Sequence, residues 1–160
     1  MREYSKDEKE YRAYVQSLKN SVLTAFYTPE PVVMQESLQV PGIRPGRFLD
    51  PSAGTGMFIS GLKGVPEVHC FEKDKLTGKI LSALYPESRV AIDGFQSIQP
   101  YYNNYFDMVS SNIPFGNTRV YDRDFDRSED VVRKSSLAAV HNYFFLKGMD
   151  TLHEGGILAY

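Results

Sequence analysis

The sequence has one cysteine, no long apolar run and no strong excess of either charge. The single cysteine, Cys70, excludes an internal disulfide bond and a zinc site built from several cysteines. Together with the absence of a signal-peptide pattern, this cysteine usage predicts a cytoplasmic protein. No apolar run approaches the roughly 20 residues that span a bilayer, so we expect no membrane partner.

Net charge, histidine spacing and chain length bear on partners, metal sites and the number of domains. The formal net charge of -2 indicates no polyanion partner by itself, although an enzyme that acts on DNA can carry its basic surface on a separate module. The histidines His69, His141 and His153 lack the spacing of metal ligands, so we expect no metal site. At 160 residues with 42% hydrophobic side chains, the chain is long enough for one domain with its own core.

The N-terminal part of the sequence predicts two helices. Residues 5–22 begin with Ser-Lys-Asp-Glu, which is a capping-box pattern. Apolar side chains then recur three and four residues apart, which predicts an amphipathic helix with an apolar face of Tyr11, Val15, Leu18 and Val22. A second helix is predicted to begin with Thr28 as its N-cap and Pro29 in its first turn, and to end before Pro41.

After residue 46 the sequence alternates short apolar runs with helical stretches. Strands are predicted at residues 47–49, 68–72, 89–92, 105–110 and 156–160. Helices are predicted at residues 57–62, 76–85 and 136–152. This alternation is typical of an α/β fold with a mostly parallel, doubly wound sheet. We therefore assign residues 24–160 to one such domain and residues 1–23 to an N-terminal helix.

Residues 116–134 do not fit this alternation. The segment is rich in both charges and has few apolar anchors, so we expect a mobile loop beside the fourth strand. Its cations suggest that it contacts DNA phosphates through Arg119, Arg123, Arg127, Arg133 and Lys134. A solvated surface without a partner is the alternative.

Residues 50–58 lie where the first strand is predicted to end and a helix to begin. The segment consists of Asp50, Pro51, Ser52, Ala53, Gly54, Thr55, Gly56, Met57 and Phe58. Glycines at such a turn let the backbone approach a ligand, and loop amides at a helix start bind carboxylates or phosphates. The dinucleotide fingerprint would need a glycine in place of Ile59, so an adenosine ligand without phosphates fits better. A tight turn without a ligand is the alternative.

Two acidic residues follow the next two predicted strands. Glu72 ends the second strand, about 20 residues after the glycine loop, where a carboxylate accepts hydrogen bonds from both ribose hydroxyls. Asp93 follows the third strand, beside the position of an adenine ring on this fold. Its carboxylate is expected to accept from the adenine amine, and Phe95 to cover the ring. The alternatives are a solvated charge at Glu72 and a plain turn at Asp93 and Gly94.

Asn112, Ile113, Pro114 and Phe115 directly follow the fourth predicted strand. The lone pair of an adenine amine is delocalised into the ring, so a methylating site should accept hydrogen bonds from both N–H groups. The Asn112 side-chain oxygen and the Ile113 carbonyl suit this role, because Pro114 disfavours helical geometry at the residue before it. Phe115 offers a flat face on which an extruded base stacks. An Asn-x-Pro turn without a catalytic role is the alternative.

In this order the motifs resemble those of the gamma-type amino-DNA methyltransferases, which methylate the N6 amine of adenine. The resemblance spans residues 24–160. Residues 50–58 are similar to the loop that holds the methionine part of the cofactor, and Glu72, beside Lys73, to the ribose-binding position. The segment similar to the family's first cofactor-binding element, which precedes the glycine loop, consists of Phe26, Tyr27, Thr28 and Pro29.

The remaining motifs complete the resemblance. Asp93, Gly94 and Phe95 are similar to the family's adenine contacts, and residues 112–115 to its catalytic tetrapeptide Asn-Pro-Pro-Tyr/Phe. Ile113 replaces the first proline, which keeps the backbone acceptor and makes the loop less rigid. The chain also resembles the methylase region of large mobile-element DNA methylase and helicase proteins.

The resemblance implies a fold, a cofactor and partners. The fold is that of a Rossmann-like class I methyltransferase, truncated after the fifth strand, and the cofactor is S-adenosylmethionine. The substrate is an adenine in double-stranded DNA, flipped out of the helix. Family members continue with further strands and a target-recognition domain, so we expect a missing C-terminal region or a partner subunit to supply DNA recognition.

Other functions remain open at this point. The same tetrapeptide polarises any planar amine, so the substrate can instead be RNA or a protein glutamine. A non-catalytic fragment that binds the cofactor or a partner is a second alternative, given Ile113 and the missing recognition domain. Ile59 argues against a dehydrogenase domain. A cytosine-type cysteine nucleophile is unsupported, because Cys70 lies inside a predicted strand.

Overall fold

The computed structural model describes residues 5–23, 44–62, 64 and 66–160. Within these residues the helices are α1 (Glu8–Leu23), α3 (Met57–Ser60), α4 (Lys75–Leu84), α5 (Arg123–Arg127), α6 (Val131–Ser136) and α7 (Val140–Thr151). The strands are β1 (Arg47–Asp50), β2 (Glu67–Phe71), β3 (Arg89–Ala91), β4 (Phe106–Ser110) and β5 (Leu152–Ala159). Two short 3-10 helices, η3 (Phe95–Ser97) and η4 (Pro100–Tyr102), connect β3 to β4. The predicted helix that begins at Thr28 lies outside the described residues.

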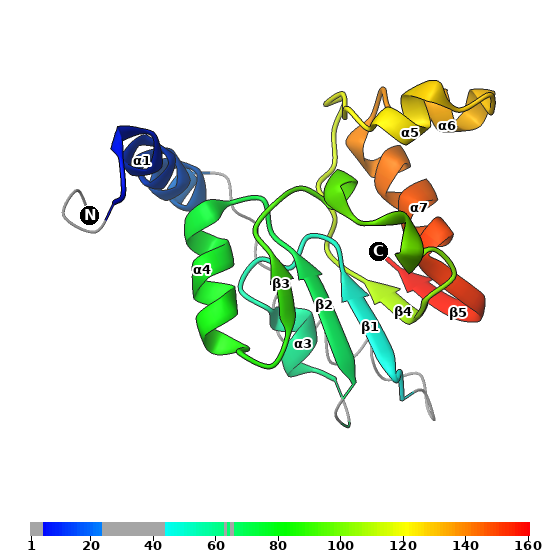
Figure 1. Ribbon diagram of the computed structural model, residues 1–160, viewed down its shortest axis with the longest axis horizontal. Helices are drawn as coiled ribbons and strands as arrows, with labels where there is room; N and C mark the ends of the chain where they lie inside the picture. Colours follow the sequence, from blue (N-terminus) through cyan, green and yellow to red (C-terminus); the bar gives the residue numbers. More distant parts are fainter. Residues whose placement is uncertain (1–4, 24–43, 63, 65) are drawn as a thin grey trace.

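The described strands form one parallel sheet in the order β3-β2-β1-β4-β5 (Figure 1). Because the strands are parallel, the segments that follow β1, β2, β3 and β4 meet at one edge of the sheet. The strand order reverses between β1 and β4, and open α/β sheets bind their ligands outside the carboxyl ends of the strands at such a point. The predicted doubly wound parallel sheet is confirmed.

Helices cover both faces of the sheet (Figure 1). Phe48 and Leu49 are neighbours in β1, and both are fully buried. They belong to opposite cores, because successive side chains of a strand point to opposite faces. The core of Phe48 includes side chains of α3 and α4, and that of Leu49 includes side chains of α7. Cys70 in β2 is fully buried, which confirms it as a core residue.

The N-terminal helix forms as predicted but buries a different face. Its buried side chains are Glu10, Tyr14 and Ser17, whereas Leu18 of the predicted apolar face is 39% exposed. Polar partners explain the difference, because this face packs on α4 through hydrogen bonds and ion pairs. The cap also differs from the prediction. The helix begins at Glu8, and the Asp7 carboxylate accepts from the Glu10 N–H at 2.7 Å.

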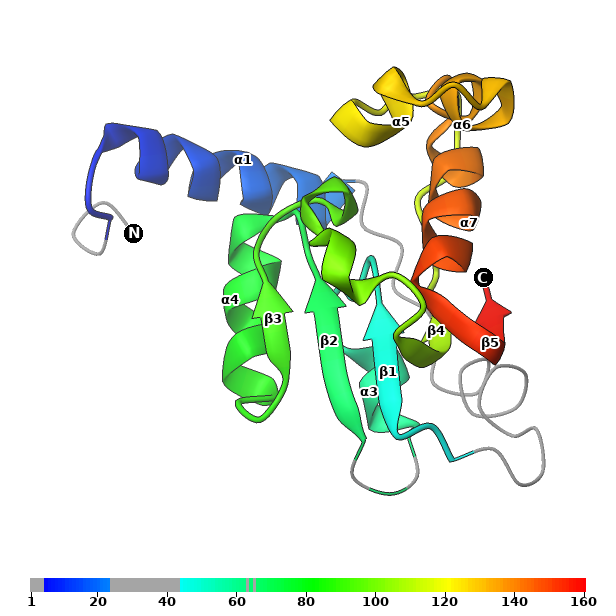
Figure 2. The same ribbon diagram turned by 45° about the vertical axis from the view of Figure 1, so that its right-hand side comes forward.

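Residues 116–134 are not the unanchored loop that their composition predicts. They contain α5 and most of α6, which lie beside the start of α7 (Figures 1 and 2). Phe125 on α5 is 1% exposed and belongs to the core beneath α7. The Asp122 carboxylate caps α5 by accepting from the backbone N–H groups of Asp124 at 2.9 Å and Phe125 at 3.1 Å. The expectation of a mobile segment is therefore wrong for α5 and α6.

Two predicted boundaries also differ from the structure. The helix expected at residues 136–152 begins only at Val140, because a turn at residues 137–139 separates α6 from α7 and lets Leu137 enter the core. The last strand begins at Leu152 rather than at residue 156. Its register against β4 shifts between Leu152 and Ile157, around Gly155, whose φ of 83° is in the left-handed region that favours glycine.

Candidate functional site

A cavity of about 520 Å³ lies at the carboxyl edge of the sheet, where the segments after β1, β2, β3 and β4 meet. This volume is within the range of small-molecule sites. The predicted site residues that line the cavity are Pro51, Ser52, Glu72, Lys73, Asp93, Gly94, Phe95, Pro114 and Phe115. The structure thus brings the predicted ribose and adenine positions to one cavity, together with the start of the glycine loop and the last two residues of the tetrapeptide. The predicted contacts Phe26, Tyr27, Thr28 and Pro29 lie outside the described residues.

Several predicted residues lie close to the cavity without lining it. Ala53, Gly54, Gly56 and Phe58 belong to the turn and short helix after β1, and Asn112 and Ile113 to the segment after β4. Asp50 is fully buried at the end of β1. Ala53 and Phe58 belong to the core that includes α4, and Ile113 to the core that includes α7, so the structure does not bring these side chains into the cavity.

Two glycines of the glycine loop have left-handed backbone angles. Gly54 has a φ of 56° and Gly56 a φ of 87°, both in the left-handed region. A Cβ atom at Gly56 would overlap the Tyr85 ring and lie 2.8 Å from the Leu81 side chain, so the loop packs tightly on α4 and on the residue that follows it. The loop's backbone N–H groups are largely used within the protein: Ala53 donates to the Phe71 carbonyl, and Gly54 to Glu72. Free loop amides for an anion, which the sequence predicts, are therefore few.

Glu72 is held by two backbone N–H groups. Its Oε2 atom accepts from the Gly54 N–H at 2.9 Å, and its Oε1 atom accepts from the Asp74 N–H at 2.7 Å. Burial raises the pKa of this carboxyl group, while the two hydrogen bonds oppose the rise. Each carboxylate oxygen retains a second lone pair, so the group can still accept two hydrogen bonds from a ligand in the cavity.

The segment after β3 offers one exposed carboxylate and one buried ring. Asp93 is exposed, and its Oδ1 atom accepts from the Gly94 N–H at 2.7 Å. Phe95 is 1% exposed and packs against Phe71 and Phe144, with ring centroids 5.7 Å and 5.4 Å away. Phe95 therefore belongs to both the cavity wall and the core.

The segment after β4 has one buried anchor and three exposed groups. Ile113 is 9% exposed and packs in the core, while Asn112, Pro114 and Phe115 are exposed. The Ile113 side chain thus supplies an apolar anchor in place of the rigidity of a second proline. Among the described residues, no group hydrogen-bonds the Asn112 side-chain amide, which leaves its oxygen available to a substrate.

Asp50 orders the loop from beneath. Its Oδ1 atom accepts from the Ser111 hydroxyl at 2.6 Å and the Ser52 N–H at 3.1 Å, which ties the ends of β1 and β4 together. Its Oδ2 atom is buried and has no hydrogen-bond partner among the described residues. Burial raises the pKa of Asp50 to about 7, although the hydrogen bond from Ser111 opposes the rise.

The raised pKa of Asp50 predicts a pH dependence of stability. Between the unfolded pKa near 3.9 and the folded value, the folded state binds one more proton than the unfolded state. The free energy of unfolding should therefore fall as pH rises through this window, by up to about 1.4 kcal/mol per pH unit. Asp50→Asn keeps the Oδ1 acceptor but cannot ionise. Urea unfolding from pH 4 to 8 should show this fall in the wild type and a smaller one in the variant, and parallel profiles would contradict the assignment.

The segment before α5 supplies cavity residues that sequence reasoning missed. Val120 and Tyr121 line the cavity, and so does Arg119, which the sequence suggested only as a phosphate contact. Tyr121 is 75% exposed and Phe115 is 74% exposed, so two aromatic side chains lie at the mouth. The signal for this wall was Asp122, an N-cap residue directly before a short helical pattern with one apolar residue, Phe125.

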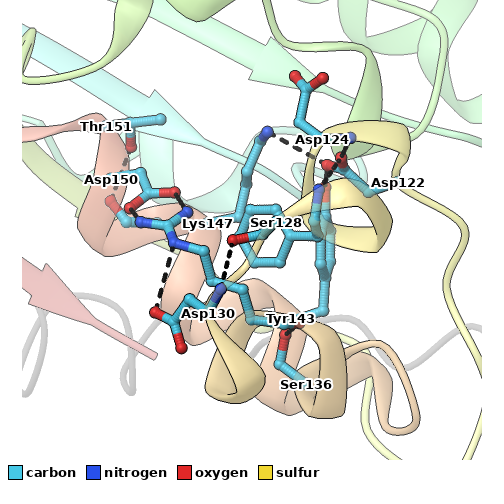
Figure 3. A network of polar contacts seen from close by, with 12 residues as sticks. Asp122, Asp124, Ser128, Asp130, Ser136, Tyr143, Lys147, Asp150 and Thr151 are labelled. Atoms are coloured by element: carbon cyan, nitrogen blue, oxygen red, sulfur yellow. Dashed lines mark hydrogen bonds and ion pairs between the residues drawn. The ribbon is translucent and has the colours of Figure 1, made fainter.

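Asp122 fixes this wall to α7 (Figure 3). Its Oδ2 atom accepts from the Tyr143 hydroxyl at 2.6 Å and pairs with Lys147 Nζ at 3.1 Å. Burial opposes the ionisation of Asp122, but the hydrogen bonds it accepts, first from Tyr143, and the charge of Lys147 hold its pKa below the usual value. In the same network, Arg133 forms two bonds of 2.5 Å to Asp150. The Arg133 side chain is thus already paired with a carboxylate, whereas the sequence suggested that it contacts DNA phosphates.

Two kinds of feature are absent from the described residues. No group of three or more His, Cys, Asp or Glu side chains among them is arranged to hold a metal ion. None of their helices combines the length and the apolar character needed to cross a membrane.

One curated relative resembles this chain in sequence, and no family model matches it. The relative is the Defense against restriction protein B of Escherichia phage P1, which is 31% identical over 144 residues. The match covers 85% of this chain but only 6% of the phage protein, so the chain spans a small part of that relative's length.

Solved structures match the fold over most of the chain. A protein from Vibrio vulnificus assigned as a type I restriction enzyme modification subunit superimposes with a TM-score of 0.60 and 19% identity, over 89% of this chain and 34% of its own. A class I S-adenosylmethionine-dependent methyltransferase assigned in Listeria monocytogenes gives a TM-score of 0.60 and 16% identity, over 97% and 53% of the two chains. The chain therefore has the Rossmann-like class I methyltransferase fold.

Proposed function

We propose that this chain is the S-adenosylmethionine-binding and catalytic region of a DNA adenine-N6 methyltransferase. The observation that supports this most is one cavity of about 520 Å³ at the carboxyl edge of the sheet. Its lining includes Pro51 and Ser52 of the loop after β1, the acidic residues Glu72 and Asp93, and the last two residues of the tetrapeptide, Pro114 and Phe115. These groups follow β1, β2, β3 and β4, whose carboxyl ends meet where the strand order reverses.

The cavity residues fit an adenosine ligand without phosphates. Phe95, Val140 and Phe144 give an apolar wall for a ring, and Glu72 presents two anchored oxygens to ribose hydroxyls. In the described lining, the only cations are Lys73 and Arg119, and most glycine-loop amides are bonded within the protein. A pyrophosphate would lack the amide cradle that dinucleotide sites provide, whereas S-adenosylmethionine does not need one.

The tetrapeptide loop supplies the catalytic groups. S-adenosylmethionine, when bound, supplies an electrophilic methyl group. The Asn112 side-chain oxygen and the Ile113 carbonyl accept hydrogen bonds from the adenine amine, which returns electron density to its nitrogen. Phe115, exposed at the cavity mouth, stacks on the extruded base. Catalysis in this scheme is positioning and polarisation, without a covalent enzyme intermediate.

Double-stranded DNA is the proposed substrate. Two likenesses support this choice, namely the phage restriction-defence protein and the restriction modification subunit. Two exposed cations suit a phosphate backbone, namely Arg119 in the cavity lining and Arg123 at the start of α5. The described residues form one sheet domain, so we propose that sequence recognition comes from a further region or a partner subunit.

A methyl-transfer assay tests the substrate. The chain is incubated with S-adenosylmethionine that carries a labelled methyl group and with duplex DNA of mixed sequence, and N6-methyladenine is quantified after digestion. Parallel reactions contain the same sequence as RNA and a glutamine-containing peptide. Label in N6-methyladenine of DNA supports the proposal. Label only in RNA or peptide would reassign the substrate, and cofactor binding without any transfer would favour a non-catalytic binding role.

Glu72→Ala should weaken cofactor binding about tenfold or more, because it removes the acceptor for both ribose hydroxyls. Titration calorimetry with S-adenosylmethionine measures this effect. Glu87→Ala is the matched control, since Glu87 is exposed and does not line the cavity. Equal binding by the Glu72 variant and the wild type would reject the ribose assignment.

A further inference from the structure

The N-terminal helix contacts the segment that holds Glu72. Ser17 on α1 is 2% exposed, and its hydroxyl donates to Asp74 Oδ1. The Ser17 Oγ atom in turn accepts from the Leu76 N–H at 3.1 Å. This contact forms because α1 lies across the N-terminal end of α4 (Figure 2). A single hydroxyl group of α1 therefore bridges a side chain and a backbone group of the segment after β2.

Asp74 links this contact to the cavity. Its backbone N–H donates to Glu72 Oε1 at 2.7 Å, and its Oδ1 atom caps α4 by accepting from the Thr77 N–H at 2.9 Å. Burial alone would raise the pKa of Asp74, but the hydrogen bonds from Ser17 and Thr77 lower it. Ser17, Asp74 and Glu72 thus form one continuous chain of hydrogen bonds that ends in the cavity wall.

Charged contacts hold α1 in this place. Glu10 is 8% exposed and pairs with Lys75 Nζ at 3.1 Å and Lys79 Nζ at 3.5 Å. The hydrogen bond from the Lys6 N–H, followed by that from Lys75, lowers the pKa of Glu10 to about 2. Tyr14 packs beneath both lysines, with Lys79 Nζ 4.8 Å from its ring centroid. These contacts keep Ser17 in register with Asp74.

From these contacts we infer that α1 is part of the cofactor site, and that Ser17 is a positioning residue that orients Glu72 through Asp74. The inference rests on the proposed function, because Glu72 orients a ligand only if it binds ribose. Ser17 does not line the cavity and acts through its two partners. If α1 served only to stabilise the fold, the effect of a Ser17 substitution on ligand binding would not depend on the ribose hydroxyls of the ligand.

The experiment compares two ligands and one variant. S-adenosylhomocysteine and its 2′,3′-dideoxy analogue are titrated into the wild type and into Ser17→Ala. The wild type should bind the hydroxylated ligand about tenfold more tightly than the analogue. Ser17→Ala should weaken binding of the hydroxylated ligand about fivefold and leave binding of the analogue unchanged, which reduces this preference.

Two further variants exclude simpler explanations. Ser82→Ala is the matched control, because the Ser82 hydroxyl donates only to the Gly78 carbonyl within α4, at 2.8 Å, and its removal should leave the preference unchanged. Asp74→Asn keeps a capping oxygen for α4 but weakens the contact with Ser17, so it should reproduce the effect of Ser17→Ala. The double variant should then be no worse than Asp74→Asn alone.

The outcomes separate the inference from the proposed function. Weakening of both ligands to the same extent by Ser17→Ala, or of neither, would overturn the positioning role while the cofactor site stands. Failure of the wild type to bind S-adenosylhomocysteine at all would reject the proposed function, and the inference with it.

Discussion

Asn112→Ala is expected to slow methyl transfer to adenine by about 10²–10³-fold, the effect of removing one transition-state hydrogen-bonding group. The Asn112 oxygen is available to an amine, because no described residue hydrogen-bonds its amide. Cofactor affinity should remain unchanged, since Asn112 is exposed and does not line the cavity. Single-turnover rates give the first quantity and titration calorimetry gives the second.

Asn117→Ala is the matched control for this prediction. Asn117 is exposed, lies five residues further along the same segment and does not line the cavity, so its removal should leave the rate intact. Loss of cofactor binding and of transfer in equal measure by Asn112→Ala would contradict the catalytic role and indicate a folding defect. An unchanged rate would remove Asn112 from the mechanism.

Asp122→Ala is expected to lower the free energy of unfolding by about 3–5 kcal/mol, because it leaves a buried charge without its partner. Lys147 is 7% exposed and pairs with Asp122 at 3.1 Å, and the Tyr143 hydroxyl would lose its acceptor as well. The cap of α5 is lost at the same time. Urea denaturation with the wild type as reference measures the change.

Asp126→Ala is the control, since Asp126 is an exposed aspartate on the same short helix. The double variant Asp122→Ala, Lys147→Met tests the physical cause. Replacing the lysine by an apolar side chain of similar length should recover much of the lost stability, because no unpaired charge then remains buried. A loss below 1 kcal/mol for Asp122→Ala would contradict the anchor described for this wall.

The sheet and the cavity were predictable because their signals are local. Each motif directly follows a strand, and the carboxyl ends of parallel strands meet at one edge. Glu72, Asp93 and Phe115 could therefore be placed in one site from their positions in the sequence. The left-handed backbone angles of Gly54 and Gly56 agree with the tight turn that a glycine-rich sequence favours, since glycine adopts such angles without steric cost.

The buried face of α1 was not predictable from apolar spacing. Hydrophobic periodicity assumes that a helix buries apolar side chains, and here the buried stripe contains Glu10, Tyr14 and Ser17. These groups are buried because Lys75 and Asp74 of another segment pair with them. Such partners lie up to 65 residues away in the sequence, as in the contact between Lys79 and Tyr14, and no local pattern reveals them.

The wall formed by residues 119–121 was missed for the same reason. Its anchor is Asp122, which bonds to a tyrosine 21 residues later, and local composition presents the region as a solvated charge cluster. Phe125 is the buried apolar residue of α5, and a single apolar side chain does not by itself indicate that the segment packs on the domain. The ion pair between Asp122 and Lys147 supplies the second anchor. A search for N-cap residues before short helical patterns would have placed α5, but not its contact with the cavity.

Calorimetric titration of the chain with S-adenosylmethionine tests the central claim most directly. The cavity between Glu72, Asp93 and the tetrapeptide loop predicts one binding site with micromolar affinity, which is weakened by Glu72→Ala and unaffected by Glu87→Ala. Absence of binding at millimolar cofactor, or binding that is insensitive to Glu72→Ala, would contradict the account.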